Sequence, residues 1–485
     1  MNYTIDKEIP LAPYRQIANQ MIDDIKDGNY GYGQKLMSVR TLAKAMNISH
    51  VTADKVFKYL ESEKLVERIQ GRGAFVIYKS PFNSETLLDK EVIKQRYASL
   101  RDSENYRSLM VNLFQNTSHV CTYNFSYALL NPEFLNDLLP SVSDLSRDPN
   151  LFKATRVYGE IKGYLPLREI MISELQVDYS LDEIIITNGN QHGINLAVAA
   201  LINKGDTVLI ETPTFTGAVD ILHNAQARLI PMKIFQEGFC IETIEELCIK
   251  YRPKLMYLTP NFSNPTGYCL DCEKRRALLA VAERYDFYIL EDDHWSDFAF
   301  EEKLIPLALM PGGSKRVIYL KGFSKIIGAD NRIGALLAPK HVVQRVEREL
   351  TLQSLGVAIL PQEYLYALIK KGYYKRALEK ITSDLKRRVR QVDKYLKVLK
   401  VYGLDYEVPR GGLNYWIKLP DNMNSEDVLF NVMYENDITF LPGRLLDVNI
   451  ESNSSHYLRL NYSFLSYNQL TLGLERLVNL LKAHF

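Results

Sequence analysis

Six short apolar runs follow one another beyond residue 150, and each is separated from the next by a stretch long enough for a helix or a wide loop. They cover residues 183–187, 207–211, 254–259, 287–291, 316–320 and 334–338. Strands that alternate with helices indicate βαβ units, and continuous apolar runs are typical of parallel strands buried on both faces. The sequence therefore predicts an α/β fold whose large domain is built on a mostly parallel sheet.

Polar residues come directly after five of these runs. They are Gly189-Asn190-Gln191, the stretch 213–215, the stretch 261–267, Asp292, and Ser324-Lys325. In open α/β sheets, ligands bind outside the carboxyl ends of the strands. The five loops therefore predict one shared pocket at that edge of the sheet.

Three helices and a hairpin are predicted at the start of the chain. Apolar residues recur at helical spacing over 13–26, 39–46 and 50–63, and Ser38 is placed to cap the second of these helices. The second and third helices are joined by the short turn 47–49, which suggests a helix-turn-helix. Two β-prone runs, 65–68 and 74–77, flank a glycine-rich turn with Arg72 at its tip. This hairpin reads as a wing.

Charge is concentrated in the same region. Residues 36–79 hold eight Lys or Arg against four Asp or Glu, which gives a local net charge of +4, whereas the whole chain carries only +1. A phosphate backbone would be attracted to this segment rather than to the molecule as a whole.

A chain of 485 residues is too long for one ordinary domain. We expect a DNA-binding domain over 1–79, a partly helical, semi-rigid linker over 80–120, and a large α/β domain over 121–485.

Several classes of protein are not expected. The sequence has no apolar run near the roughly 20 residues that span a bilayer and no apolar core behind a basic start, so we expect a cytoplasmic protein with no membrane partner. The five cysteines do not suggest a disulfide framework. Cys269 and Cys272 form one C-x-x-C without a second pair or nearby histidines, so no metal is expected.

The large domain resembles the fold type I aminotransferases, which use pyridoxal 5'-phosphate. The resemblance is carried by Asn264-Pro265-Thr266-Gly267, Asp292-Asp293, Ser324-Lys325 and Arg332. It implies that Lys325 forms a Schiff base with the cofactor's aldehyde. Lys321 is an alternative, but only Lys325 has the preceding serine and the downstream arginine at the family's spacing. The alternative interpretation of Lys325 is an ordinary surface lysine exposed to solvent.

The resemblance also assigns the groups that would hold the cofactor ring. Asp292 would pair with the protonated pyridine nitrogen, Asn264 would bind the phenolic oxygen, and Phe215 would stack on the ring. Phe215 is almost as well explained as an ordinary core aromatic. Where the family usually has a tyrosine shortly after the ring aspartate, this chain has His294 and Trp295. A histidine would make the bond to the phenolic oxygen sensitive to pH.

The phosphate would lie at the start of the helix after Gly189, where a helix N-terminus offers N–H donors. The expected contacts are Gly189, Asn190, Gln191, Ser324 and Arg332, with Tyr158 reaching the phosphate of a neighbouring subunit. That role of Tyr158 implies an obligate dimer. The hydroxyl residue usual three positions before the lysine is Gly322 here, and the usual proline is Ala329, so one phosphate contact is in doubt.

Arg459, in the stretch HYLRLNYS, matches the arginine that grips a substrate carboxylate. It implies an amino or keto acid ligand. The alternative is an arginine on the exposed face of a strand.

Residues 12–78 resemble the winged helix-turn-helix of GntR-type regulators. The resemblance implies that double-stranded DNA is bound by Ser38, Arg40, Ser49, His50, Thr52 and Arg72, with the start of the third helix in the major groove and Arg72 in the minor groove. His50 and Val51 stand where the family often has Arg and Asn. The alternative is a dimerisation or linker module, which would leave the wing arginine and the local charge unexplained.

A winged helix, a linker and an aminotransferase-like domain in this order resemble the MocR-type transcription regulators. The resemblance implies a head-to-tail homodimer whose pocket senses an amino compound or pyridoxal phosphate and shifts DNA occupancy. The competing hypothesis is an active aminotransferase with a secondary DNA-binding module. A third hypothesis is a sensor of the cofactor alone, against which Arg459 argues.

Overall fold

The computed structural model contains two compact units, Met1–Lys90 and Glu91–Phe485. The structure describes residues 3, 5, 11–26, 35–69, 73–77, 121–148, 151–152, 158–175, 179–233, 240–301, 305–449 and 453–484. The expected linker over 80–120 and the wing tip with Arg72 lie outside the described residues. The expected domain boundaries therefore stay predictions.

The described residues of the first unit form three helices and a hairpin. These are α1 (Pro13–Lys26), α2 (Val39–Ala45), α3 (His50–Ser62), β1 (Val66–Ile69) and β2 (Gly73–Val76). The strands are antiparallel and pair Val66 with Val76. Val56, Phe57 and Leu60, which the sequence places inward, are fully buried in the core of this unit. Each expected element is confirmed, and its ends lie within one residue of the prediction.

Two serines fix where the helices of the turn begin. Ser38 precedes α2 and its hydroxyl accepts a hydrogen bond from the Thr41 amide at 3.1 Å. Ser49 precedes α3 and accepts from the Thr52 amide, also at 3.1 Å. Capping of this kind satisfies an amide that has no partner inside the helix. The start of α3 is thereby held in one conformation.

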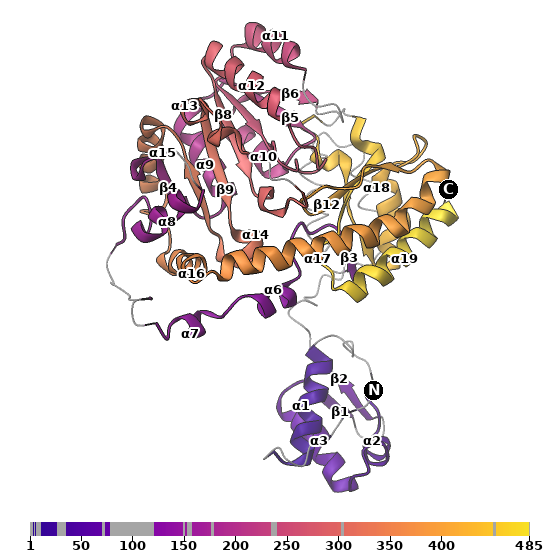
Figure 1. Ribbon diagram of the computed structural model, residues 1–485. Coiled ribbons are helices and arrows are strands. Elements are labelled where there is room, and N and C mark those ends of the chain that lie inside the picture. Colours follow the sequence, from indigo (N-terminus) through magenta and orange to yellow (C-terminus); the bar gives the residue numbers. More distant parts are fainter. Residues whose placement is uncertain are drawn as a thin grey trace. The chain divides into compact units, whose positions relative to one another are not determined.

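The second unit is built on a seven-stranded sheet, seen in the upper part of Figure 1. Its spatial order is β4 (Ile184–Thr187), β10 (Gly334–Leu337), β9 (Val317–Gly322), β8 (Tyr288–Asp293), β7 (Leu255–Leu258), β5 (Thr207–Thr212) and β6 (Arg228–Lys233). The strands from β9 to β6 are parallel. The expected mostly parallel sheet is therefore confirmed.

Two features of the sheet differ from the prediction. β10 runs antiparallel to both of its neighbours, β4 and β9. β6 has no counterpart among the six predicted runs, because it is an edge strand that contains Pro231 and is only partly buried. A proline is acceptable at an edge, where one side of the strand needs no partner, and here it separates Leu229 and Ile230 from Met232, so that no continuous run of strand-forming apolar residues marks the strand.

Helices pack on the sheet. The core on one face is formed with α9 (Asn190–Leu201), α10 (Thr216–Asn224) and α15 (Lys340–Ser354), whose apolar side chains meet those of the strands. The remaining helices between the strands are α8 (Leu165–Leu175), α11 (Ile241–Tyr251), α12 (Cys272–Arg284), α13 (Gly313–Arg316) and α14 (Ser324–Ile327).

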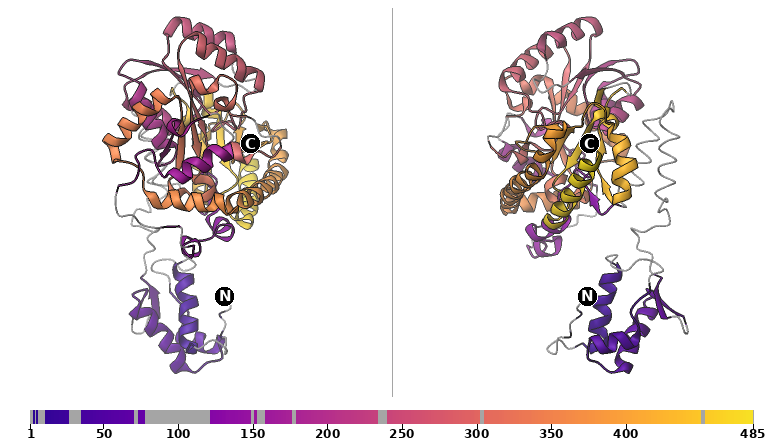
Figure 2. Two further views of the ribbon diagram at one scale, coloured as in Figure 1. Left: turned by 60° about the vertical axis from the view of Figure 1, so that its left-hand side comes forward. Right: turned by 90° about the vertical axis from the view of Figure 1, so that its right-hand side faces the viewer.

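A smaller layer follows the sheet. The helices α16 (Ile359–Lys370) and α17 (Tyr373–Leu396) lead to a four-stranded sheet in the order β11 (Asp405–Tyr406), β12 (Asn414–Lys418), β15 (Tyr457–Asn461) and β14 (Leu441–Pro442). α18 (Ser425–Val428) lies between strands, and α19 (Tyr467–His484) lies beside α17 (Figure 2). The start of the unit contributes β3 (Tyr123–Asn124), which pairs with β13 (Ile438–Thr439), then α6 (Pro132–Leu138) and α7 (Val142–Leu145).

No described helix has both the length and the apolar character that crossing a membrane requires.

Candidate cofactor and effector site

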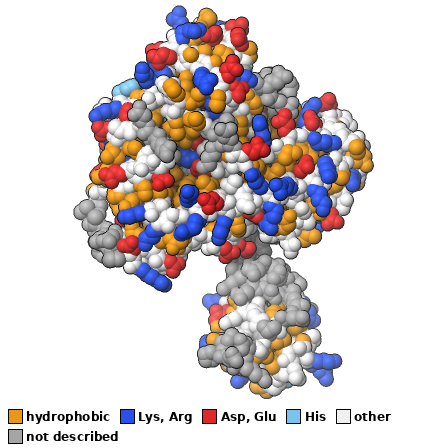
Figure 3. Space-filling view, viewed as in Figure 1, with side chains coloured by type: hydrophobic (Ala, Val, Ile, Leu, Met, Phe, Trp, Pro, Cys, Tyr) orange, Lys and Arg blue, Asp and Glu red, His pale blue; other side chains and the backbone are white. Residues whose placement is uncertain are grey.

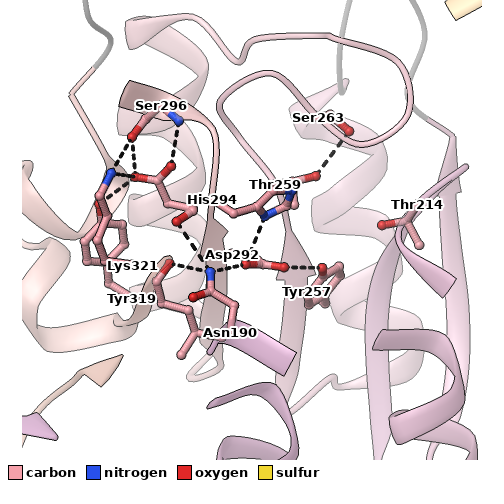
Figure 4. Close-up of polar contacts among 12 residues, drawn as sticks. Asn190, Thr214, Tyr257, Thr259, Ser263, Asp292, His294, Ser296, Tyr319 and Lys321 are labelled. Carbon is pink, nitrogen blue, oxygen red and sulfur yellow. Dashed lines mark hydrogen bonds and ion pairs between the residues drawn. The ribbon is translucent and has the colours of Figure 1, made fainter. Parts of the chain in front are cut away.

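The loops after β4, β8 and β9 meet at one edge of the sheet. The Asn190 side-chain amide donates to Asp292 Oδ1 at 2.6 Å and to the Leu320 carbonyl at 3.1 Å (Figure 4). These bonds tie the first turn of α9 to the ends of two neighbouring strands. The amide of Asn190 is therefore directed at the aspartate rather than toward a phosphate, and its buried Oδ1 has no hydrogen-bond partner.

Asp292 is a buried carboxylate at the end of β8. Tyr257 donates to its Oδ2 at 2.8 Å, and Nδ1 of His294 lies 3.3 Å from its Oδ1. Burial alone would raise the pKa of Asp292, but the His294 ring and the hydrogen bonds from Asn190 and Tyr257 more than offset it, so the pKa lies below its usual value. An ionised carboxylate in this position suits a cationic ligand group.

Lys325 lies in α14, one residue after Ser324, and is partly buried. Burial and the positive charges of Arg459 and Arg332 lower the pKa of its amine to about 8. At pH 7 about one amine in ten is then unprotonated, against fewer than about one in a thousand at the usual pKa. A neutral amine is the form that attacks a carbonyl carbon.

Lys321, the alternative to Lys325, lies in a different environment. It is buried in β9, its Nζ is 2.8 Å from Asp297 and 3.5 Å from Asp293, and it donates to Ser296 at 3.0 Å. Burial tends to lower the pKa of Lys321, but the two carboxylates more than offset this, and the pKa is raised. Lys321 is therefore held as a charged group, and of the two lysines Lys325 is the one whose environment favours the neutral amine.

Three residues form what we call the phosphate cradle: Gly189, Ser324 and Arg332. Gly189 has φ of +77°, and a Cβ atom there would lie 3.3 Å from Arg332 Nη2 and 3.7 Å from Ser324 Oγ. The absence of a side chain at Gly189 thus keeps the start of α9 open between a hydroxyl and a guanidinium, a setting that suits a phosphate. Gln191 follows, and its side chain is exposed. Its backbone N–H, in the first turn of α9, is therefore the group expected to bind a phosphate.

Arg459 is buried in β15, with 6% of its surface exposed, so the reading of it as a surface residue is wrong. It donates to Asn264 Oδ1 at 2.8 Å and to the Ser126 carbonyl at 2.6 Å. Its Nε has no hydrogen-bond partner, and no carboxylate pairs with it among the described residues. Burial lowers the pKa of this guanidinium to about 10. A buried cation without an acidic partner indicates a place for an anionic ligand.

Glu211, at the end of β5, is a group that the sequence analysis missed. Its buried carboxylate accepts hydrogen bonds from Thr214 at 3.0 Å, from the Thr259 amide at 3.1 Å, and from the Thr259 hydroxyl. Burial raises its pKa to about 7, although these bonds favour the ionised form. Glu211 thereby joins the loop that carries Phe215 to the loop that carries Asn264.

The last two expected contacts are placed differently. Phe215 is partly buried, packs against the core of the sheet, and lies over Gly217, so the stacking role and the core role both remain open. Tyr158 is 85% exposed. Its expected contact with a neighbouring subunit stays a prediction.

Residues 131–477 match the family model of aminotransferase class I and II, and residues 13–76 match that of the gntR family of bacterial regulatory proteins. The chain belongs to the aminotransferase class I and II family. With a gntR-family module at its start, this family member has the two-part arrangement of the MocR-type regulators.

This aminotransferase-family chain is similar both to transcription regulators and to aminotransferases. YdfD of Bacillus subtilis strain 168, an HTH-type transcriptional regulator, is 25% identical over 99% of this chain and 99% of its own length. The 2-aminoadipate transaminase of Thermus thermophilus is 29% identical over 67% of this chain and 81% of its own. The crystal structure of LysN, an α-aminoadipate aminotransferase from the same organism complexed with N-(5'-phosphopyridoxyl)-L-leucine, is similar at a TM-score of 0.68 and 24% identity, covering 80% and 96% of the two chains.

One departure from the class I and II aminotransferase pattern has a structural explanation. A Cβ atom at Gly322 would lie 3.0 Å from Asn190 Oδ1 and 3.2 Å from His294 Cβ. A larger residue there would press against the two side chains that hold Asp292. Since Nδ1 of His294 faces Asp292, only its Nε2 is left for the expected bond to a phenolic oxygen.

The gntR-family unit presents its expected DNA contacts at the starts of two helices. Ser38, Arg40, Ser49 and His50 are exposed, and Thr52 is partly exposed. The neighbouring Val51 is 66% exposed, which leaves an apolar side chain in solvent at the start of α3. An exposed helix start of this kind suits contact with base edges.

Proposed function

We propose that this chain is a transcription regulator that binds DNA through its gntR-family unit and senses an amino acid through pyridoxal phosphate held in its aminotransferase-like unit. The proposal is supported by one observation: Lys325, an amine of lowered pKa, lies close enough to Arg459 for the charge of this buried guanidinium, which has no carboxylate partner among the described residues, to contribute to the lowering. The amine suits an aldehyde cofactor, and the guanidinium suits an α-carboxylate.

The residues around Lys325 fit the cofactor. Asp292, which is buried and whose pKa is lowered, would hold a protonated ring nitrogen. The phosphate cradle and the backbone N–H groups of Asn190 and Gln191 would hold the phosphate, with Asn264 and His294 near the phenolic oxygen. Bound there, pyridoxal phosphate supplies an aldehyde and an electron-withdrawing ring.

A homodimer is part of the proposal. Leu352, Leu355 and Leu360 are 72%, 52% and 51% exposed near the junction of α15 and α16. Gly356, in the same segment, lies beside Ile161, since a Cβ at Gly356 would be in van der Waals contact with the Ile161 Cα, and Ile161 follows exposed Tyr158 by three residues. Exposed apolar groups that gather in this way mark an association surface. A head-to-tail partner would cover them and receive Tyr158.

The role of Arg459 predicts a loss of amino acid binding. In Arg459→Ala, the affinity of an amino acid for the cofactor-loaded protein should fall by about 2–5 kcal/mol, because the carboxylate would lose its charged partner in a buried site. Titration followed through the cofactor's absorption measures this. An amine that lacks the carboxylate should bind both proteins equally, and an equal amino acid response in both proteins would remove the carboxylate role.

The proposed contact between the wing and DNA leads us to expect a loss of DNA affinity when Arg72 is replaced. Although Arg72 lies outside the described residues, its expected place at the hairpin tip makes it a DNA contact, and Arg72→Ala should weaken binding to a selected operator by about 1–3 kcal/mol. Binding isotherms at several salt concentrations give this value. Exposed Lys204 provides a control, since Lys204→Ala should change nothing. Unaltered affinity and salt dependence in Arg72→Ala would contradict the wing contact.

The second candidate is an aminotransferase, favoured by the same Lys325, Asp292 and Arg459. Steady turnover of an amino donor by the full chain, unaffected by removal of residues 1–78, would support that function.

A sensor of pyridoxal phosphate alone is disfavoured, because binding the cofactor alone does not require a buried arginine at position 459 that can bind a carboxylate. We also propose a cytoplasmic location, which a DNA target would require.

A further inference from the structure

A groove with basic walls runs along α17. The helix carries eight Lys or Arg and three Asp or Glu, a net charge of +5, in a chain whose total is +1. Figure 3 shows Lys and Arg side chains gathered on the face of the molecule that α17 crosses. The groove is lined by Phe134 of α6 and by Lys380, Ser383, Lys386, Arg387 and Arg390 of α17.

Packing of the opposite side of α17 directs these cations outward. Ile381, Leu385, Val389 and Val392 are buried, and they recur at helical spacing. Arg388 is the basic residue of this stretch that turns inward, where it donates to the Leu465 carbonyl at 2.6 Å. The helix is therefore fixed in rotation, and its basic face is held in solvent.

Protein groups leave most of this positive charge uncompensated. The acidic residue of the groove, Asp384, pairs with Arg387 at 2.7 Å and also with Arg388. Arg387 is further held over the Tyr467 ring, 4.2 Å from its centroid. Within the described part of the chain, Lys380, Lys386 and Arg390 form no ion pair. Three cations thus face the groove without an acidic partner among the described residues.

We propose that this groove binds the phosphate backbone of duplex DNA that flanks the bases read by the gntR-family unit. From Lys380 to Arg390 the cations extend about 15 Å along the helix, which corresponds to about four or five base pairs. The groove is lined mainly by Lys and Arg, whose charges attract phosphates whatever the base sequence, so the contact adds affinity without sequence preference. The inference rests on the proposed function, because DNA held by one unit is at high effective concentration for the other.

The test uses the full, cofactor-loaded chain with three charges reversed: Lys380→Glu, Lys386→Glu and Arg390→Glu. The matched control reverses the exposed Lys204, Arg276 and Lys315, which are also two lysines and one arginine outside the pocket. Each protein is titrated with an operator selected from a random duplex library, either trimmed to the bound bases or extended by unrelated flanks. Salt dependence is recorded for both duplexes.

The wild type and the control should bind the extended duplex more tightly than the trimmed one. The groove variant should lose this gain, and the slope of its log affinity against log salt should become shallower by about 2–3, since about 0.9 is lost per phosphate contact. A groove variant that gains from the flanks as the control does would overturn the proposal, as would a change only in oligomeric state. If the wild type binds neither duplex, the DNA-binding function itself fails.

Discussion

Lys325→Ala is expected to abolish covalent attachment of pyridoxal phosphate. Lys325 is the lysine in the pocket whose amine is deprotonated in part at neutral pH, since burial, Arg459 and Arg332 lower its pKa to about 8. Borohydride reduction followed by mass spectrometry of peptides measures attachment, and the visible absorption of the bound cofactor reports the same event. In the wild type, the modified peptide should contain Lys325 alone.

The variant should still fold and should still bind the cofactor without a covalent bond, because Asp292 and the phosphate cradle are unchanged. A cofactor-sized mass on Lys321 in the variant, or an unaltered absorption band, would contradict the assignment. Either result would require Lys321 to leave its two carboxylates, which the structure gives no reason to expect.

Lys321→Ala is expected to destabilise the large unit by about 3–5 kcal/mol, because its removal leaves buried charge uncompensated. The Lys321 and Asp293 side chains are 4% and 0% exposed, and Asp297 is 18% exposed. Tyr319 and Ser296 donate hydrogen bonds to Asp293, but neither brings a positive charge. The free energy of unfolding in urea, followed through the transition of the large unit, measures the loss.

Lys340 offers a matched control. Its ion pair with Asp182 has a contact distance of 2.6 Å, yet both side chains are more than half exposed. Exposed pairs contribute about 0–1 kcal/mol, so Lys340→Ala should have little effect. If the two variants lost equal stability, the structural role assigned to Lys321 would be wrong.

The two predictions separate two lysines that lie four residues apart. The sequence places both near the end of one apolar run, and strand alternation does not decide between them. The structure separates them because Lys321 lies within β9 among acidic side chains, while Lys325 lies beyond it in α14 among cations. The deciding partners, Asp297 and Arg459, come from other segments of the chain.

The edge of the sheet at which these polar side chains meet was predictable, because the rule for parallel sheets depends only on strand order and polarity. It located Gly189, Asn264, Asp292 and Lys325 at the ends of predicted strands. The direction of β10 could not be predicted, since an apolar strand looks alike in both directions.

Three residues of the site were missed, and their signals differ. Glu211 ends an apolar run just as Glu291 does, and a buried acid at a strand end is a signal that reasoning from sequence could have used. In the sequence, Tyr257 is one more aromatic residue of a strand. Only the structure shows that its hydroxyl donates a hydrogen bond to Asp292. Ser126 contributes its backbone carbonyl to Arg459, so no side-chain pattern reveals it.

A regulator of the proposed kind must bind DNA with a different affinity when the site around Lys325 is occupied. An effector can shift this equilibrium only if it binds the two states of the regulator with different affinities. An amino acid would contact both Arg459 and the cofactor on Lys325. It would shift the equilibrium if these contacts differ between the two states.

The most direct test measures the affinity of the full chain for a selected operator duplex in three states: without cofactor, with cofactor, and with cofactor plus each member of an amino acid panel. Cofactor absorption is recorded in the same samples. We expect that an amino acid which shifts the absorption also changes DNA affinity, and that Arg459→Ala loses both responses. Equal DNA affinity in all three states, with the absorption shift present, would contradict the proposed regulation.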